Sequence, residues 1–458
     1  MRRTLLSAAA GAPLVIGSLI FPAAPANAET LRDALALAYE TNPTIRAERA
    51  RLRATREAGA QAWAGALPQV TASGSIDQTD LTQTVQFPTG AGGEQAPPSG
   101  GNVDFTAIAG GLEASQPVFT GFRNFNTIKQ ARARIRAGGA QLVATEQQVL
   151  RDVATAYFDV QLTMAIYELN LKNVEVLRRQ NEMAQVRFEV GEITRTDVAQ
   201  SEARLADARA QLSQAQGNLA VSRANYAQLV GRAPGDLETV ETLPDLPETL
   251  ENAQALAREF APAAVGAREQ AEVSRRQIAI ARGALLPSVS LTTSYQYAED
   301  PSPFTLDSEQ FAYGVRASVP LFQGGLNYSR IREARALHAS DRASVIEAER
   351  QVEAQVNASW QNLVAARVII RSAQASVDAN QLALEGVRRE AMVGTRTTLD
   401  VLDAEQELLN AEVSLVNARR DEQAAAFSLL AAAGLLTPAS LGVDATAAQD
   451  AALELYER

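Results

Sequence analysis

The sequence contains no cysteine, a single histidine (His338) and few aromatic residues. Without cysteine the chain cannot form disulfides, cysteine-ligated zinc sites, thiol nucleophiles or a lipid-modified N-terminal cysteine. Arginines are interspersed with carboxylates and the net charge is −11, so the basic surface that nucleic-acid binding requires is missing. The scarcity of histidine and cysteine, with no compact set of catalytic side chains, predicts a chain without enzyme activity, cofactor or metal.

Long hydrophobic runs are also scarce. After residue 28, no stretch approaches the roughly 18 unbroken apolar residues of a transmembrane helix. Residues 1–28 are typical of a secretory signal peptide, with two arginines before an apolar run and an A-x-A cleavage motif that ends at Ala28. We therefore expect an exported protein, and any membrane-spanning part of the mature chain would have to be a closed β-barrel.

An internal repeat organises the rest of the chain. Gly191 and Asp197 correspond to Gly394 and Asp400 at an offset of 203 residues, whereas the start of each half corresponds at an offset of 219. The offset changes only at the Gly/Pro-rich segment Phe87–Asn102, so the first half carries a longer loop. The predicted division is a signal peptide (1–28), a first repeat (29–233), a linker (234–248), a second repeat (249–436) and a C-terminal tail (437–458).

Each half is predicted to contain the same series of elements. A helix broken at a proline, Pro43 or Pro262, comes first, and a pair of strands of about ten residues follows it. In the second half, residues 288–297 and 310–319 alternate between apolar and polar side chains, which is typical of strands with one apolar face. A very long helix, a break at a glycine and a shorter return helix complete each half.

The stretch Gly394–Leu430 has an unusual pattern for a helix. An ordinary amphipathic helix has one apolar face, but this one has two apolar flanks that are separated by polar faces. One polar stripe begins with Asp400 and Asp403, and Glu405 lies on the opposite polar face. The return helix of the first half, from Asp197 onward, repeats the pattern. Such a helix needs neighbours on both sides and water in front and behind, like a stave in the wall of a hollow cylinder.

The chain resembles the TolC family of outer-membrane efflux and secretion channels over nearly its whole mature length. The motifs that carry the resemblance are RFEVGEITRTDV (187–198), VGTRTTLDVLDAEQELL (393–409), SQPVFTG (115–121) and SVPLFQGG (318–325). The resemblance implies a mainly α protein with a β-barrel portion. A long α-helical coiled-coil barrel would be joined to four strands per chain, which contribute to a trimeric transmembrane β-barrel. Residues 87–102 and 298–309 would then be extracellular loops.

The resemblance also implies partners and a location. It predicts a homotrimer in the outer membrane of a Gram-negative cell, in contact with outer-membrane lipid, with a tunnel that extends into the periplasm. A membrane-fusion adaptor and an inner-membrane transporter of the RND or ABC type would complete the export machine. Drugs and other small molecules, secreted proteins, or both remain possible cargoes, since selectivity in such systems belongs largely to the transporter.

Particular residues match the gate of that family. Asp400 and Asp403 match the two aspartates that line the narrowest aperture, and Arg396 and Asp197 match residues that hold the entrance closed. Ala391 stands where the family has a tyrosine of this closing network, so one closing contact is missing. The helix breaks would form the periplasmic tip that docks with the adaptor, at residues Val190, Gly191, Glu192, Val393, Gly394 and Thr395.

The residues alone leave other interpretations open. An acidic pair three residues apart at the start of a helix could simply be solvated and interact with the helix dipole. A periplasmic coiled-coil adaptor or scaffold without a pore would share the long helices, but it would not need four amphipathic strands. An enzyme is a third and weaker possibility, because no catalytic constellation accompanies the aspartates.

Overall fold

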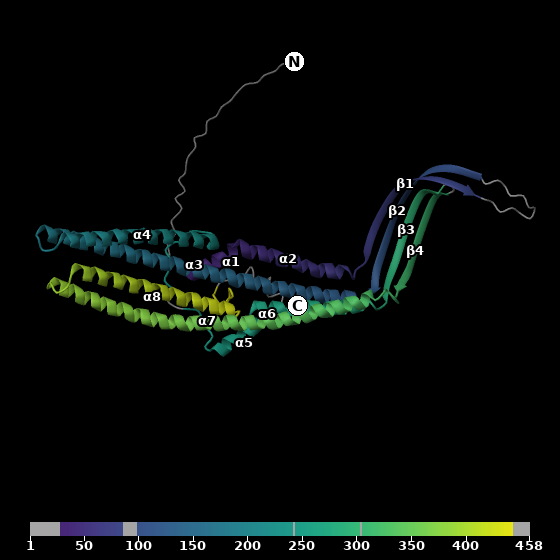
Figure 1. Cartoon of the computed structure of the whole chain (residues 1–458). Coiled ribbons are helices and arrows are strands. Elements are labelled where there is room, and N and C mark those ends of the chain that lie inside the picture. The colour runs from purple at the N-terminus through teal and green to yellow at the C-terminus, as the bar shows by residue number, and fades with distance from the viewer. Residues whose placement is uncertain (1–27, 86–98, 241–242, 303–304, 443–458) are drawn as a thin grey trace, which may run out of the picture.

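The computed structural model describes residues 28–85, 99–240, 243–302 and 305–442, so most of the predicted signal peptide and of the predicted tail lies outside the described residues. The molecule is a long helical body with a four-stranded sheet at one end (Figure 1). Its elements are α1 (Leu31–Thr41), α2 (Pro43–Ala64), β1 (Gln69–Val85), β2 (Ser99–Phe119), α3 (Arg123–Glu189), α4 (Arg195–Val230), α5 (Leu250–Phe260), α6 (Pro262–Gly283), β3 (Ser288–Ser302), β4 (Thr305–Ser318), α7 (Leu326–Met392) and α8 (Thr398–Ala432).

The predicted order of elements recurs in both halves of the chain. The series α1, α2, β1, β2, α3, α4 is followed by α5, α6, β3, β4, α7, α8, and the long helices α3 and α7 have 67 residues each. At 1.5 Å per residue each of them is about 100 Å long. The breaks fall where the prolines predict them, because α2 begins at Pro43 and α6 begins at Pro262. At the first break Asn42 caps α2, and its side chain accepts a hydrogen bond from the Thr44 amide at 2.9 Å.

The strands are longer than the pattern predicted. All four are antiparallel in the order β1-β2-β3-β4, and they contain 17, 21, 15 and 14 residues. Most of the loop expected at 298–309 is therefore strand, as is the end of the loop expected at 87–102, of which residues 87–98 lie outside the described part. Once the register of a pair is set, each further antiparallel pair satisfies backbone hydrogen bonds, so polar residues can continue the ladder.

The longer helices form a wall, on which the short α5 packs against α6 and α7, and α4 also contacts α8 near the far end. On the side far from the sheet the order is α4, α3, α8, α7, and near the sheet it is α2, α3, α6, α7 (Figure 1). The two apolar flanks predicted for α8 are confirmed, because α8 packs along α7 on one side and α3 on the other. Glu405 is an exception. It was placed on a solvated face, but it is 8 % exposed and forms an ion pair with Arg388 of α7.

No helix in the described part of the chain is both long and apolar enough to cross a membrane.

The centre of the helical body holds the most deeply buried side chains. Tyr157 and Phe158 of α3 meet Tyr226 of α4 and Phe427 of α8 in one cluster of edge-on and tilted rings. At 0–1 % exposure, all four rings are shielded from water. Because aromatic side chains bury large areas, this cluster fixes the two helical hairpins against each other at their sheet-proximal ends.

A buried carboxylate ties the start of the chain to this centre. Glu29, 8 % exposed, accepts hydrogen bonds from the Tyr226 hydroxyl at 2.7 Å, from Arg232 at 2.8 Å and from the Gly235 amide at 3.3 Å. Burial raises the pKa of Glu29, but the bonds from Arg232 and Tyr226 outweigh it and hold the pKa below its ordinary value. The Glu29 backbone also pairs with the linker, donating to the Asp236 carbonyl at 2.7 Å.

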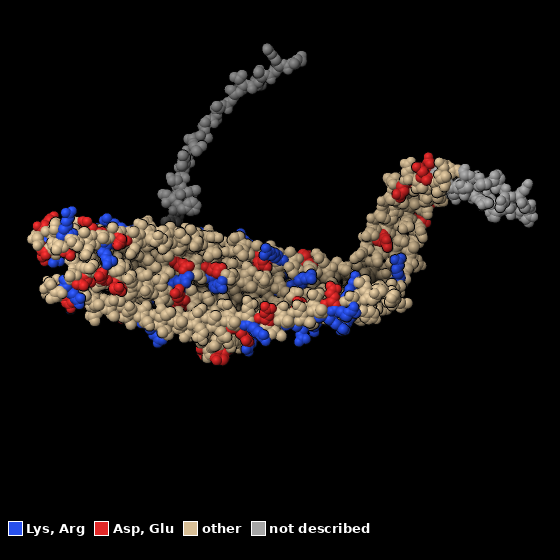
Figure 2. Space-filling model, viewed as in Figure 1, with Lys and Arg blue, Asp and Glu red and all other residues tan. Residues whose placement is uncertain are grey.

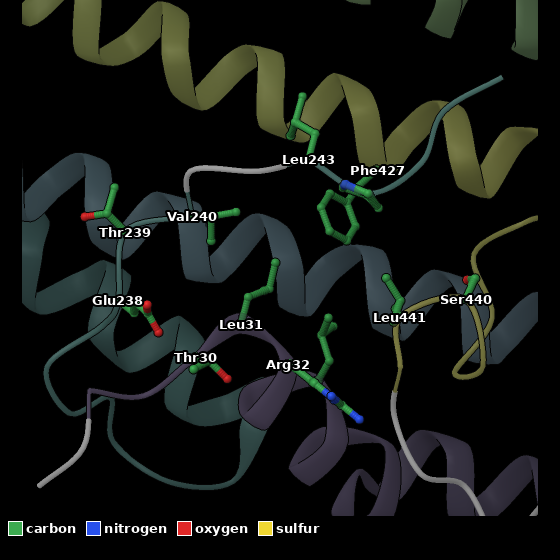
Figure 3. Close-up of a pocket in the computed structure, with 12 residues that line it drawn as sticks. Thr30, Leu31, Arg32, Glu238, Thr239, Val240, Leu243, Phe427, Ser440 and Leu441 are labelled. Atoms are coloured by element: carbon green, nitrogen blue, oxygen red, sulfur yellow. The ribbon is translucent and has the colours of Figure 1, made fainter. Parts of the chain in front are cut away.

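An open pocket of about 790 Å³ lies beside this junction. Figure 3 shows its lining, which comes from the start of α1 (Leu31, Arg32), the linker (Val240, Leu243), α8 (Phe427) and the segment after α8 (Leu441). Its apolar and polar side chains are mixed, and it lies where three segments without regular structure meet. We therefore regard it as a packing gap of the junction.

Two equivalent glycines end the return helices in different surroundings, which gives a test of the packing. Gly231 has φ +92° and Gly434 has φ +76°, so alanine is strained at either position, by about 1 kcal/mol. A Cβ on Gly434 would lie 2.6 Å from the Phe260 backbone, whereas one on Gly231 would meet nothing closer than 3.7 Å. We expect Gly434→Ala to lose about 1–3 kcal/mol more than Gly231→Ala in denaturant unfolding in detergent. Equal losses would contradict this packing.

Candidate functional site

The predicted tip is formed by the two turns that join the long helices to the return helices. α3 gives way to α4 at Gly191 and α7 gives way to α8 at Gly394, with φ +79° and +80°, a conformation that glycine adopts without a steric penalty. Beyond each glycine, a backbone amide reaches back to the last turn of the helix: Glu192 to the Arg187 carbonyl at 2.8 Å, and Thr395 to the Glu390 carbonyl at 3.0 Å. Both turns are therefore glycine C-caps of the Schellman type.

A capping box starts each return helix and fixes the first predicted aspartate. The Asp400 carboxylate accepts hydrogen bonds from the Thr397 amide and hydroxyl, both at 2.8 Å, and the Asp400 amide donates to the Thr397 hydroxyl at 3.2 Å. Asp197 makes the same contacts with Thr194 at 2.9, 2.8 and 3.3 Å. The hydrogen bonds from Thr397 and Thr194 lower the pKa of Asp400 and Asp197, so both remain ionised at neutral pH.

The second predicted aspartate links the two helical hairpins. Asp403 of α8 accepts a hydrogen bond from Arg204 of α4, with 2.6 Å between Nη2 and Oδ1. Beside this pair, Leu402 packs against Leu177 of α3 and Leu205 of α4. The ion pair is half exposed and worth little by itself, but together with the apolar cluster it joins the two hairpins near their tips.

The predicted closing residues make contacts within their own turns. Arg396 donates to Glu390 at 2.9 Å, and its Nη1 lies 4.0 Å from Oδ1 of Asp400. Within the described chain, no hydrogen bond or ion pair joins Asp197 to Arg396. The structure of one copy thus brings Arg396 to Asp400 and leaves Asp197 in the other turn.

The ends of the turns carry exposed apolar side chains between charged ones. Val190 and Val393, which are equivalent in the repeat, are 73 % and 75 % exposed, and Met392 is 79 % exposed. Acidic and basic side chains crowd this end of the body in Figure 2. Both turns are thus available for contact with another molecule.

Some of these contacts had a signal in the sequence and others had none. The capping boxes are visible as Thr194-x-x-Asp197 and Thr397-x-x-Asp400, a spacing known to begin helices. Arg204 and Glu390 were missed as partners of Asp403 and Arg396. Arg204 is 199 residues from Asp403, so only the packing of α4 near α8 could have identified it.

No group of three or more metal-binding side chains occurs in the part of the chain that the structure describes. The tip of a single copy therefore offers scattered carboxylates rather than a preformed coordination site.

Comparisons with known proteins agree on one kind of protein. The profile of the family described as outer membrane efflux protein matches residues 34–232 and 253–435. Outer membrane efflux protein BepC from Brucella suis is 30 % identical over 447 residues, which cover 97 % of this chain and 94 % of that protein. Outer membrane protein TolC from Vibrio cholerae is 28 % identical over 421 residues, 90 % of this chain and 92 % of that protein. The structure of VceC, also from Vibrio cholerae, has a TM-score of 0.71 at 22 % identity and covers 88 % of this chain and 96 % of that one.

Proposed function

Because the chain belongs to the outer membrane efflux protein family, we propose that three copies close into one tube that conducts cargo from the periplasm through the outer membrane. The export role and the outer-membrane location follow from the family. The number of copies, the gate and the partners are the proposal. The observation that supports this proposal is that a single copy is an open sheet of strands and helices, with an edge along each of its two long sides that could pair with another copy.

The two edges of one copy run along its entire length. Among the described residues, the strand order leaves β1 and β4 without a partner on their outer sides, and the helix order leaves α2 and α4 at one edge and α7, with the short α5 packed on it, at the other. Four strands cannot close a barrel, whereas three copies supply twelve. A contact between unlike edges closes into a ring when its rotation matches the number of copies.

The internal repeat supplies the register of the contact between copies. Within one copy, α8 packs on α3, with Arg420 bonded to Asp159 at 2.7 Å and Leu402 packed on Leu177. In the repeat, α4 is the equivalent of α8 and α7 is the equivalent of α3. If α4 packs on α7 of the neighbouring copy as α8 packs on α3 within one copy, Gly217 lies opposite Asn362 of the neighbour and Ala199 lies opposite its Asn380. Ala199 is exposed in the single copy, as expected of a residue that contacts a neighbouring copy.

In such a ring the tip becomes the gate. Each copy would bring Asp400 and Asp403 to a shared axis, which gives two rings of like charge at the narrow end of the tube. Carboxylate rings attract cations and bind divalent ions at close quarters. Arg204 and Arg396 restrain the carboxylates within each copy. Opening would separate the hairpin that carries Asp403 from the hairpin that carries Arg204.

The partners follow from the two ends of the tube. We propose that the exposed turns dock a membrane-fusion adaptor through Val190, Gly191, Glu192, Val393, Gly394 and Thr395, and that an inner-membrane transporter drives export. The chain itself would catalyse no reaction. A periplasmic scaffold without a pore is the weaker candidate, since it gives no role to the long sheet with its exposed apolar side chains, among them Ile76, Leu112, Phe311 and Tyr313.

Disulfide trapping tests the ring directly, and the lack of native cysteine removes background. We expect a chain with Ala199→Cys and Asn380→Cys to form covalent dimers and trimers, and no larger species, after oxidation in isolated membranes. The control combines Ala199→Cys with Asn362→Cys, which lies roughly 27 Å further along α7, too far for a disulfide. Cross-linking that is absent, equal in both variants, or extends beyond three chains would overturn the proposed ring.

A further inference from the structure

A pocket of about 550 Å³ opens where the helices meet the sheet. Apolar side chains line one part of it, from Phe122 and Phe125 of the α3 start and Leu286 after α6, and arginines line the other part. Figure 2 shows basic side chains gathered on the helical body just before the sheet begins. We propose that this pocket binds a phospholipid of the membrane leaflet nearest the helices, with the phosphate on the arginines and an acyl chain on the aromatic rings.

The arginines lie on one face of α6. Arg268, Arg275 and Arg282 are spaced by seven residues, which keeps them nearly in line along the helix. Arg268 donates to the Arg258 carbonyl of α5 at 2.7 Å, so the face that carries these arginines is the face on which α5 lies. An extra helix inside the proposed tube would obstruct it, so this face is the outer one. The inference therefore rests on the proposed tube for its orientation.

The charge of the pocket suits an anion. Arg275 and Arg276 share a single carboxylate, Glu272, at 2.5 and 2.6 Å. Arg282 is exposed, and no residue in the described part of the chain forms a hydrogen bond or an ion pair with its guanidinium. The lining contains no carboxylate of its own. Arg282 thus has its full set of donors free for a phosphate, in the fork geometry that phosphate oxygens accept.

The position along the molecule favours a lipid over a dissolved anion. Leu286 comes just before β3, and Phe122 comes just after β2, so the pocket lies at the level where the chain enters the membrane. Lys129 lies 4.2 Å above the ring of Phe125, which keeps a cation beside the apolar surface. In the repeat, Arg282 corresponds to Trp63 and Phe125 to Tyr328, and both are exposed, at 53 % and 63 %. Such side chains are enriched at the headgroup level of membranes.

Thermal unfolding of the full-length protein in a neutral detergent tests the site. We expect short-chain phosphatidylglycerol to raise the Tm, and neither diacylglycerol of the same chain length nor glycerol phosphate to do so at equal concentration. Arg282→Gln should weaken the response roughly tenfold in lipid concentration. Arg371→Gln, the matched control, should leave it unchanged, because Arg371 is also exposed and without a partner in the described chain but lies on α7 far from the sheet.

Each other result would overturn the proposal. An equal response to diacylglycerol would mean a purely apolar groove, and an equal response to glycerol phosphate would mean a general anion site. A response that Arg282→Gln leaves intact would place the lipid elsewhere. Should that variant fail to fold, Arg282→Lys keeps the charge and must still respond. Disulfide trapping between copies is independent of this measurement, so failure of the lipid site and failure of the tube can be told apart.

Discussion

Replacing Asp400 and Asp403 together by asparagine should relieve the block of the channel by divalent cations by at least about a hundredfold in blocking concentration. Six carboxylates, two from each of three copies, would lose their charge at the narrowest point of the tube. The loss corresponds to about 2.7 kcal/mol of binding free energy for the ion, a modest figure for a ring of carboxylates. The measurement is single-channel conductance of the purified protein in planar bilayers, titrated with a divalent cation.

Asparagine is the better substitution because of what the structure shows at Asp400. Its carboxylate accepts a hydrogen bond from the Thr397 amide in the capping box. Alanine would remove that acceptor and destabilise the start of α8 by about 1 kcal/mol. Asparagine removes the charge and keeps an oxygen for the cap. A changed block can then be attributed to charge rather than to a frayed helix.

Two further variants separate the charge from the closing contacts. Arg204→Gln breaks the bond to Asp403 and leaves both carboxylates, so it should raise the conductance of the closed entrance while the cation block persists. Asp378→Asn removes an exposed charge from α7 whose one side-chain hydrogen bond within the described residues comes from Gln374, and it should change neither quantity. Cation block that survives in the doubly substituted channel would show that these aspartates do not form the aperture.

The repeat and the helix pattern predicted the wall of this protein well, because both are periodic properties of the chain. The two flanks of α8 need only the 3.6-residue period, and the structure supplies a neighbour for each, α7 and α3. The ends of the strands were predicted poorly, because the alternation of apolar and polar side chains ends before the backbone pairing between the strands does. The pairs Glu299–Asp307 and Ala298–Ser308, which have no apolar face, continue the β3–β4 ladder through backbone hydrogen bonds.

The site was predictable where its chemistry is local. The glycine turns and the aspartates at the helix starts depend on neighbours three to five residues away, so their positions follow from short motifs. The bond between Arg204 and Asp403 and the buried position of Glu405 depend on which helices lie side by side, and no short pattern encodes that. Contacts between copies involve a second chain, so the sequence of one copy indicates their register only through the internal repeat.

The second large effect is expected far from the gate, at Glu29. Replacing Glu29 by alanine should lower the free energy of unfolding by about 2–3 kcal/mol, because it leaves the buried Tyr226 hydroxyl without its acceptor, whereas the half-exposed Arg232 can be hydrated. Thermal or denaturant unfolding in detergent measures the loss. Asp33→Ala, four residues along the chain, removes an exposed carboxylate that accepts hydrogen bonds from the Thr30 amide and hydroxyl in the capping box of α1, and it should cost about 1 kcal/mol.

The pH dependence of stability identifies the charge as the cause. The pKa of Glu29 in the folded protein lies below its ordinary value of 4.5, so the unfolded chain takes up this proton first as the pH falls. The stability that Glu29 contributes is therefore complete above pH 4.5 and is lost as the pH falls through the pKa that Glu29 has in the folded protein. Glu29→Gln keeps the shape of the side chain but has no proton to bind, so its stability should fall less steeply below pH 4.5 than that of the native chain. Parallel acid profiles for the two proteins would mean that the carboxylate is held by shape and not by charge.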